Sequence, residues 1–367
     1  MASLTESDLA DTKTRKGAAT TDVLKAYGVS EELALELMRD MLLYRRFEEK
    51  AEEAYAIGKI GGFCHLHIGQ EGACAGSIKP LRDDDYVISA YREHTQAIAK
   101  GVAPNAVMAE LYGRVGGASG GKGGSMHIFG AHVRFMGGHG IVGAQIPLAT
   151  GFAWKIKYRR EDSVAVCFMG DAAVNQGGFH ESLNMAAVWE LPVIYVVEHN
   201  EYGMGTAFNR VSTTDMEEKS GPHGISGVSV DGQDVLATYA LFRKLVQDVR
   251  DGAGPQFVNL ETYRFRGHSM SDPVSGTYRS TEEVERRKQK EDPIGVLRDK
   301  LFSGGILDQE GLEEMDAEAR RLAQEAADFA EESPAPGPEA LYRNVWAELN
   351  PNARHFFDGR SEGRSRG

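Results

Sequence analysis

The sequence has 367 residues, of which 41% are hydrophobic and 26% charged, and its formal net charge is −13 at pH 7. The composition is typical of a globular protein, and the acidic balance argues against a general nucleic-acid-binding protein, which would present a basic face. No apolar run approaches the roughly 20 residues of a membrane-spanning helix, and the N-terminus lacks the apolar core of a signal peptide, so we expect a cytoplasmic protein that contacts neither nucleic acid nor membrane.

The N-terminal part of the chain changes from a polar arm to a helical pattern. Residues 1–21 are polar and aperiodic, which predicts a flexible arm. Beyond Ser30, apolar residues recur at steps of three and four, and the glycines from Gly58 onward end the pattern. The apolar positions of this predicted helix are Leu37, Met41, Tyr44, Phe47, Ala51 and Ala54.

A glycine-dense stretch follows, from Gly113 to Gly143. Apolar segments lie on both sides, so we interpret it as backbone that approaches a ligand closely rather than as a linker. It contains the spacing Gly138-x-Gly140-x-x-Gly143 of a dinucleotide fingerprint, which makes an NAD-binding oxidoreductase an alternative. The preceding run, Val133 to Met136, is a poor candidate for a buried strand and argues against that alternative.

The middle of the chain alternates buried strands with helices. Apolar runs at 164–169, 193–197 and 257–260 predict strands, and helical patterns follow residue 177 and cover 239–249. Repeated strand–helix–strand units predict an α/β fold with a doubly wound, mostly parallel sheet and helices on both faces. We assign residues 22–350 to this one domain, including C-terminal helices at 312–329 and 341–349, and residues 351–367 to a polar tail.

Two polar residues follow two of these strands. Asp171 and Asn200 lie 29 positions apart, and their oxygens suit Mg²⁺, which shares its coordination shell readily with phosphate. A helix that begins near Gly177 would direct free N–H groups to the same place and favour an anion. Asp171 could instead only cap a helix. With Asn200 at this spacing, we predict a magnesium-diphosphate site.

The segment from Gly170 to Thr206 resembles the thiamine diphosphate motif. Its flanking NQG, NMAA, LP and YGMGT resemble the α subunits of the 2-oxo acid dehydrogenases, and the resemblance runs from about residue 33 to 342. It implies that Mg²⁺ is held by the side chains of Asp171 and Asn200 and by the backbone carbonyl of Tyr202. Two positions differ from the family, which usually has Gly at Ala172 and Asn at His199.

Other blocks extend the resemblance. YREH resembles the diphosphate clamp, GHGIVGAQIPLATG the strip beneath the aminopyrimidine, and FCHLHIGQE and YRFRGHSMSDP the loops with the active-site histidines His65 and His268. The implied cofactor-binding residues are Tyr91, Arg92, Gly140, Val142, Gly170, Asp171, Ala172, Ala173, Asn200, Tyr202 and His268. A metal pair of His65 with His67 lacks a third ligand. Ser269 lies where some relatives are phosphorylated.

The resemblance implies a function for the chain as half of an enzyme. Such subunits bind thiamine diphosphate, decarboxylate a 2-oxo acid and pass the acyl group to the lipoyl arm of an acyltransferase component. The glutamate that activates the cofactor has no matching block here, so we expect a β subunit to supply it in an α2β2 heterotetramer. The blocks around His65 and His268 look more like the pyruvate branch, which predicts pyruvate as substrate. A branched-chain 2-oxo acid or acetoin dehydrogenase remains an alternative, whereas the intact motifs argue against a non-catalytic regulatory subunit.

Overall fold

The computed structural model describes residues 20–272 and 276–343. The predicted arm up to residue 19, most of the predicted helix at 341–349 and the predicted tail at 351–367 lie outside the described residues. Within the described part, the arm ends earlier than expected, because helix α2 (Thr20–Tyr27) begins at Thr20. Before residue 344, the described C-terminal segment contains the short 3₁₀ helix η7 (Pro338–Leu341).

Six parallel strands form the central sheet, in the order β2-β1-β3-β4-β8-β7. Two further short strands form an antiparallel hairpin beside it. The strands are β1 (Tyr86–Ala90), β2 (Phe135–His139), β3 (Ala165–Gly170), β4 (Val193–His199), β5 (Tyr202–Gly203), β6 (Thr206–Ala207), β7 (Gly227–Asp231) and β8 (Gln256–Glu261). The predicted fold class is therefore confirmed.

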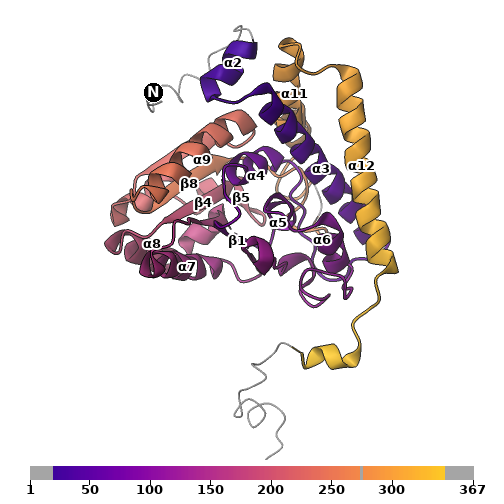
Figure 1. The fold of residues 1–367 in the computed structure, drawn as a ribbon, viewed down its shortest axis with the longest axis horizontal. Helices are drawn as coiled ribbons and strands as arrows, with labels where there is room; N and C mark the ends of the chain where they lie inside the picture. Colours follow the sequence, from indigo (N-terminus) through magenta and orange to yellow (C-terminus); the bar gives the residue numbers. More distant parts are fainter. Residues whose placement is uncertain (1–19, 273–275, 344–367) are drawn as a thin grey trace, which may run out of the picture.

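Helices cover both faces of the sheet (Figure 1). α4 (Glu71–Ile78), α5 (His94–Ala99) and α9 (Val235–Arg250) lie on one face, and α7 (Gln145–Arg159) and α8 (Gly177–Val188) on the other. Alternate residues of the strands enter two separate cores: on β4, Val196 packs with the first group of helices and Val197 with the second. Burial on both faces explains why the central strands are almost continuously apolar.

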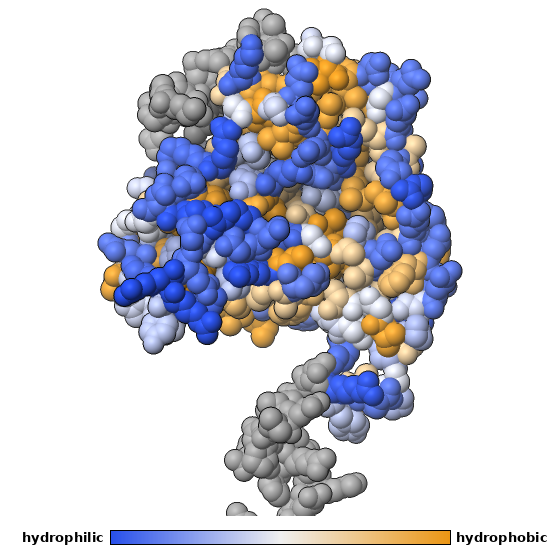
Figure 2. Space-filling view, in the orientation of Figure 1, coloured by the Kyte–Doolittle hydropathy of each residue, from blue (hydrophilic) through white to orange (hydrophobic). Residues whose placement is uncertain are grey.

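An outer helical layer packs on the first face. It consists of α3 (Glu31–Ala56), α6 (Pro104–Leu111) and α12 (Gln309–Glu332), and α3 and α12 run side by side (Figure 1). Ser30 caps α3 by accepting a hydrogen bond from the backbone N–H of Leu33, and the predicted apolar positions of α3 are all buried. α12 presents a largely hydrophilic outer surface in Figure 2 and buries alanines against its neighbours.

The remaining elements are short or lie near the C-terminal side of the sheet. They are α10 (Thr281–Glu291), α11 (Pro293–Ser303), η2 (Gly124–Met126), η3 (Ala131–Val133), η4 (Asp171–Asn175), η5 (Phe208–Arg210) and η6 (Glu217–His223). None of the helices in the described ranges combines the length and the apolarity that a bilayer crossing requires.

The glycine-rich stretch differs from its prediction in two ways. First, residues 135–139 do form a strand, β2, where a poor strand was expected. β2 is an edge strand of the sheet, next to β1, so it needs less apolar surface than a central strand. Gly138 lies inside this strand, whereas the glycines of a dinucleotide fingerprint follow one.

Second, much of the stretch wraps an internal carboxylate rather than a ligand. The carboxylate of Glu110, on α6, is fully buried and accepts four backbone N–H groups of the loop. The donors are Ser119 (2.7 Å), Gly121 (2.9 Å), Gly123 (2.6 Å) and Gly124 (3.2 Å). A Cβ atom on Gly117 would lie 2.3 Å from Glu110 Oε2, so glycine is needed there for close approach.

Candidate active site

A cavity of about 580 Å³ lies at the carboxyl ends of the parallel strands. Every site residue that the sequence suggested lines it: His65, Tyr91, Arg92, Gly140, Val142, Gly170, Asp171, Ala172, Ala173, Asn200, Tyr202 and His268. Five strands deliver almost all of them: Gly170 is the last residue of β3, and all the others except His65 follow the end of β1, β2, β3, β4 or β8. His65 alone comes from the loop that precedes α4. Ligands of doubly wound sheets bind at this edge.

Asp171 leaves the end of β3 and is 3% exposed. Its Oδ2 atom has no hydrogen-bond partner among the described residues, and Nε2 of His199 lies 4.0 Å from it. Burial raises the pKa of Asp171, although the nearby imidazole of His199 partly opposes this. A buried carboxylate with an unpaired oxygen is costly, and a bound cation would offset that cost.

Asn200 and Tyr202 contribute neutral oxygens close by. The side-chain amide of Asn200 is oriented by its own hydrogen bond to Gln70 Oε1 (3.2 Å), so Oδ1 faces the other way. Arg264 Nη1 lies 3.1 Å from that Oδ1 and 3.5 Å from the Tyr202 carbonyl oxygen. The backbone flanking Tyr202 is unusual, with positive φ at Glu201 (70°) and Met204 (53°). Such conformations cost free energy and cluster at functional sites. A carboxylate, an amide oxygen and a carbonyl oxygen form a donor set that fits Mg²⁺.

Ala172, which stands where the resemblance implies glycine, packs against Gly203. Ala172 does not adopt a positive φ, so its backbone does not require glycine. Its methyl group instead faces the hairpin, where a Cβ atom on Gly203 would lie only 2.7 Å from Ala172 Cβ. Gly203, which has no side chain, therefore leaves room for the methyl group of Ala172.

Two guanidinium groups lie in the cavity wall. Arg92 is 7% exposed and Arg264 is 1% exposed. Burial and the like charge of Arg264 lower the pKa of Arg92 to about 10, and burial also lowers the pKa of Arg264. Two buried cations on one cavity favour an anionic ligand such as a diphosphate.

Arg92 also holds protein backbone. Its Nη1 donates to the carbonyl of Leu66 (2.6 Å) and its Nη2 to the carbonyl of His268 (2.6 Å). The guanidinium thus cross-links the two loops that carry His65 and His268, in addition to facing the cavity.

Three rings cluster beside these arginines. The ring centroid of His65 lies 4.6 Å from that of Tyr91 and 5.2 Å from that of His268, and Tyr91 and His268 are 5.7 Å apart. Burial and the charge of Arg92 lower the pKa of His65 to about 2 and that of His268 to about 3. Both imidazoles are therefore neutral at pH 7 and can each donate one hydrogen bond and accept another.

The start of α8 does not line the cavity, contrary to the expectation for the helix near Gly177. The 3₁₀ helix η4 intervenes, and the residues at its start, Asp171 to Ala173, reach the cavity instead. The extra turn could not be read from the sequence because a short 3₁₀ turn and the first turn of an α-helix have similar composition.

His67 does not form a metal-binding pair with His65, because both of its ring nitrogens contact other side chains. Its ring nitrogens contact Thr95 Oγ1 (2.9 Å) and Glu198 Oε1 (2.8 Å). Glu198, which lines the cavity, is held further by Gln96 Nε2 at 3.0 Å. In the described ranges, no three His, Cys, Asp or Glu side chains are grouped so as to hold a metal ion; this criterion does not cover amide or carbonyl oxygens.

Sequence reasoning missed three charged residues of the cavity, Glu198, Arg264 and Asp272. Arg264 lies in the YRFRGHSMSDP block, four residues before His268, and its position there was the available signal. Glu198 is the last residue but one of an apolar strand, where a charged residue is unexpected unless it is paired.

Comparisons with known proteins agree with this geometry. Residues 39–339 match the family model described as dehydrogenase E1 component. The chain is 47% identical over 317 residues to the pyruvate dehydrogenase E1 component subunit alpha of Rhizobium meliloti, covering 86% of this chain and 90% of that one. It is 46% identical over 323 residues to the subunit of the same name from Zymomonas mobilis (87% and 90% covered) and 40% identical over 336 residues to the mitochondrial one of Sminthopsis macroura (92% and 90%).

Proposed function

The chain belongs to the dehydrogenase E1 component family, whose enzymes use thiamine diphosphate, and we propose that it is the α subunit of a pyruvate dehydrogenase. The observation that carries this proposal is the unpaired buried oxygen of Asp171 beside Asn200 and Tyr202, in a cavity walled by two arginines. Similarity to relatives that carry this name supports pyruvate over branched-chain 2-oxo acids or acetoin.

We propose that Asp171, Asn200 and the carbonyl of Tyr202 hold Mg²⁺, and that Arg92, Arg264 and the N–H groups entering η4 hold the diphosphate. The charges are complementary, because a carboxylate suits the metal ion and guanidinium groups suit the anion. Gly140 and Val142, which follow β2, would lie under the aminopyrimidine. When bound, thiamine diphosphate supplies a nucleophile for the keto carbon and accepts the electron pair that decarboxylation releases.

His65 and His268 would contact the substrate as neutral imidazoles. With pKa values of about 2 and 3, neither is protonated at pH 7, so each offers one N–H group to an oxygen of the 2-oxo acid or of the acyl product. Their assignment as catalytic residues stays a prediction, as does the cytoplasmic location.

A β subunit would complete the site and the α2β2 assembly. Val142, which lines the cavity, is 39% exposed, and its apolar neighbour Ile141 is 76% exposed, which fits coverage by a partner. The acyl group would then pass to a lipoyl group on an acyltransferase component, an oxidoreductase reaction with a disulfide as acceptor.

The proposal is tested by reconstituting the chain with its β subunit and a lipoyl domain. Acetylation of the lipoyl group should depend on thiamine diphosphate and should be fastest with pyruvate. Faster turnover of a branched-chain 2-oxo acid would show that pyruvate is not the preferred substrate. Binding of NAD with no response to thiamine diphosphate would overturn the function.

A further inference from the structure

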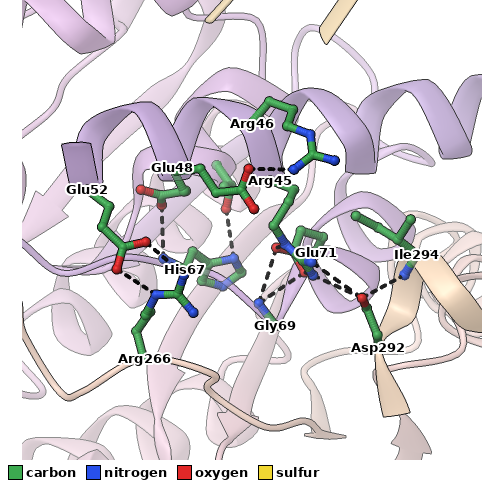
Figure 3. Close-up of polar contacts among 12 residues, drawn as sticks. Arg45, Arg46, Glu48, Glu52, His67, Gly69, Glu71, Arg266, Asp292 and Ile294 are labelled. Carbon is green, nitrogen blue, oxygen red and sulfur yellow. Dashed lines mark hydrogen bonds and ion pairs between the residues drawn. The ribbon is translucent and has the colours of Figure 1, made fainter. Parts of the chain in front are cut away.

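Helix α3 carries a row of charged residues on its inner side. Arg45, Glu48 and Glu52 are spaced three and four residues apart, so they lie on one face of the helix. Figure 3 shows all three directed at segments from elsewhere in the chain. Arg45 pairs with Glu71 and Asp292. The two glutamates instead contact the loop that contains His65 and the loop that contains His268. Glu48 is completely buried within the apolar stripe of α3. A charged residue is rarely buried to this extent unless its side chain is paired.

Glu48 holds the loop that carries His65. Its Oε1 accepts the backbone N–H of His67 (2.9 Å), as Figure 3 shows, and its Oε2 pairs with His94 Nδ1 (2.9 Å). His94 Nε2 contacts Ser125 Oγ (2.8 Å), which in turn accepts the backbone N–H of His65 (3.2 Å). Burial alone would lower the pKa of His94, but the carboxylate of Glu48 raises it above its ordinary value. One carboxylate thus fixes the backbone on both sides of Leu66.

Glu52 holds the loop that carries His268. It forms a two-pronged ion pair with Arg266, with Nε–Oε1 at 2.7 Å and Nη2–Oε2 at 2.8 Å (Figure 3). Arg266 stands two residues before His268. Paired hydrogen bonds of this kind fix the plane of a guanidinium as well as its distance, so they anchor the backbone that bears it.

Arg92 joins the same two loops from the cavity side. Arg92 donates hydrogen bonds to the carbonyls of Leu66 and His268. Each loop is therefore bound by a glutamate of α3 on one side and by Arg92 on the cavity side.

We propose that Glu48 and Glu52 are positioning residues, through which helix α3 sets the relative placement of His65 and His268. They act through the two loops and touch neither cavity nor ligand. The role of the two histidines in turnover rests on the proposed function, whereas the tethering of their loops does not. Both glutamates belong to one helix, so the two loops are anchored to a single structural element.

The Glu52 tether gives the cleaner experiment, because Glu52 is partly exposed and its substitution leaves the core intact. In the reconstituted complex, Glu52→Gln and Glu52→Ala should lower kcat by roughly 10- to 100-fold, by analogy with the range known for outer partners of metal ligands, with thiamine diphosphate affinity within about twofold of wild type. The exchange Glu52→Arg with Arg266→Glu should recover most of the lost kcat. Glu53→Gln, on the same helix in an exposed pair with Lys50, is the matched control and should change nothing.

Site-resolved modification by diethyl pyrocarbonate gives a readout independent of activity. In Glu52→Ala the modification of His268 should accelerate several-fold while that of the exposed His180 stays unchanged; in Glu48→Gln the acceleration should fall on His65. Unchanged kcat and unchanged reactivity, uniform acceleration at all histidines, or failure of the charge exchange would each overturn the proposal. If the wild-type complex neither binds thiamine diphosphate nor turns over, the proposed function fails, while the reactivity pattern still decides the tether.

Discussion

Arg264 Nη1 lies 3.1 Å from Asn200 Oδ1, so a guanidinium contacts the amide oxygen that we propose as a magnesium ligand. The same side chain reaches the carbonyl of Tyr202 and the hydroxyl of Tyr278. The arginine is therefore held at the junction between the proposed metal ligands and the proposed diphosphate position.

The first prediction concerns that arginine. Arg264→Met keeps an unbranched apolar stem but removes a buried cation from the anion site. Hydrogen bonds to charged groups contribute about 1.5 to 3 kcal/mol, so the Kd of thiamine diphosphate should rise roughly 10- to 100-fold, as measured by calorimetry on the reconstituted complex. Arg298→Met, which removes an exposed arginine paired with Asp299, serves as control. Equal affinities in both variants would remove Arg264 from the diphosphate site.

The second prediction tests the contact between Ala172 and Gly203. Gly203→Ala places two methyl groups 2.7 Å apart, which forces the hairpin away from the cavity and moves the neighbouring carbonyl of Tyr202. Cofactor affinity should fall in this variant and recover when Ala172→Gly is added. A double variant as weak as the single one would show that the two side chains do not oppose each other in this way.

The third prediction concerns the loop around Glu110. Glu110→Gln has the same shape but only one acceptor oxygen for four N–H donors, and its amide group faces two of them. Because hydrogen bonds to charged groups contribute about 1.5 to 3 kcal/mol each, the free energy of unfolding in urea should fall by about 3 kcal/mol or more. Amide exchange at residues 119–124 should accelerate first. Glu331→Gln, at an exposed pair with Lys59, should leave both measurements unchanged.

The fourth prediction is a pH dependence of stability at Glu93. Its carboxyl is fully buried, and burial raises its pKa from 4.5 to about 8, so the folded protein keeps the acid protonated where the unfolded chain does not. Its contribution is fully present below pH 4.5 and is lost as the pH rises to about 8, by at most about 1.4 kcal/mol for each pH unit crossed.

Glu93→Gln imitates the protonated acid and cannot ionise. The difference in unfolding free energy between this variant and the wild type should therefore shift in favour of the variant as the pH rises through that window. A difference that does not change with pH would mean that Glu93 is ionised in the folded protein.

The central strands could be predicted because both of their faces are buried. β3, β4 and β8 are runs of apolar residues with helices on each side, and the predicted runs match them closely. β1, β2 and β7 were not predicted, because they are short and lie nearer the edges of the sheet. β7, with the sequence GVSVD, has an alternating pattern too brief to distinguish from a loop.

The residues that line the cavity could be predicted from motifs, but their partners could not. Glu110 illustrates the difference: the glycines around it predicted a backbone that approaches a ligand closely, and nothing in the sequence showed that the group it surrounds is a side chain of the same chain. Arg264 and Glu48 belong to the same class, since their roles depend on contacts across long sequence separations.

The central claim is most directly tested by the binding of thiamine diphosphate to the reconstituted complex, measured by calorimetry with Mg²⁺ and with EDTA. The wild-type complex should bind tightly only with the metal ion. Asp171→Ala removes the unpaired buried oxygen and should abolish this metal-dependent binding, while the variant complex still assembles. Normal, magnesium-dependent binding by the Asp171→Ala complex would contradict the assignment of the site.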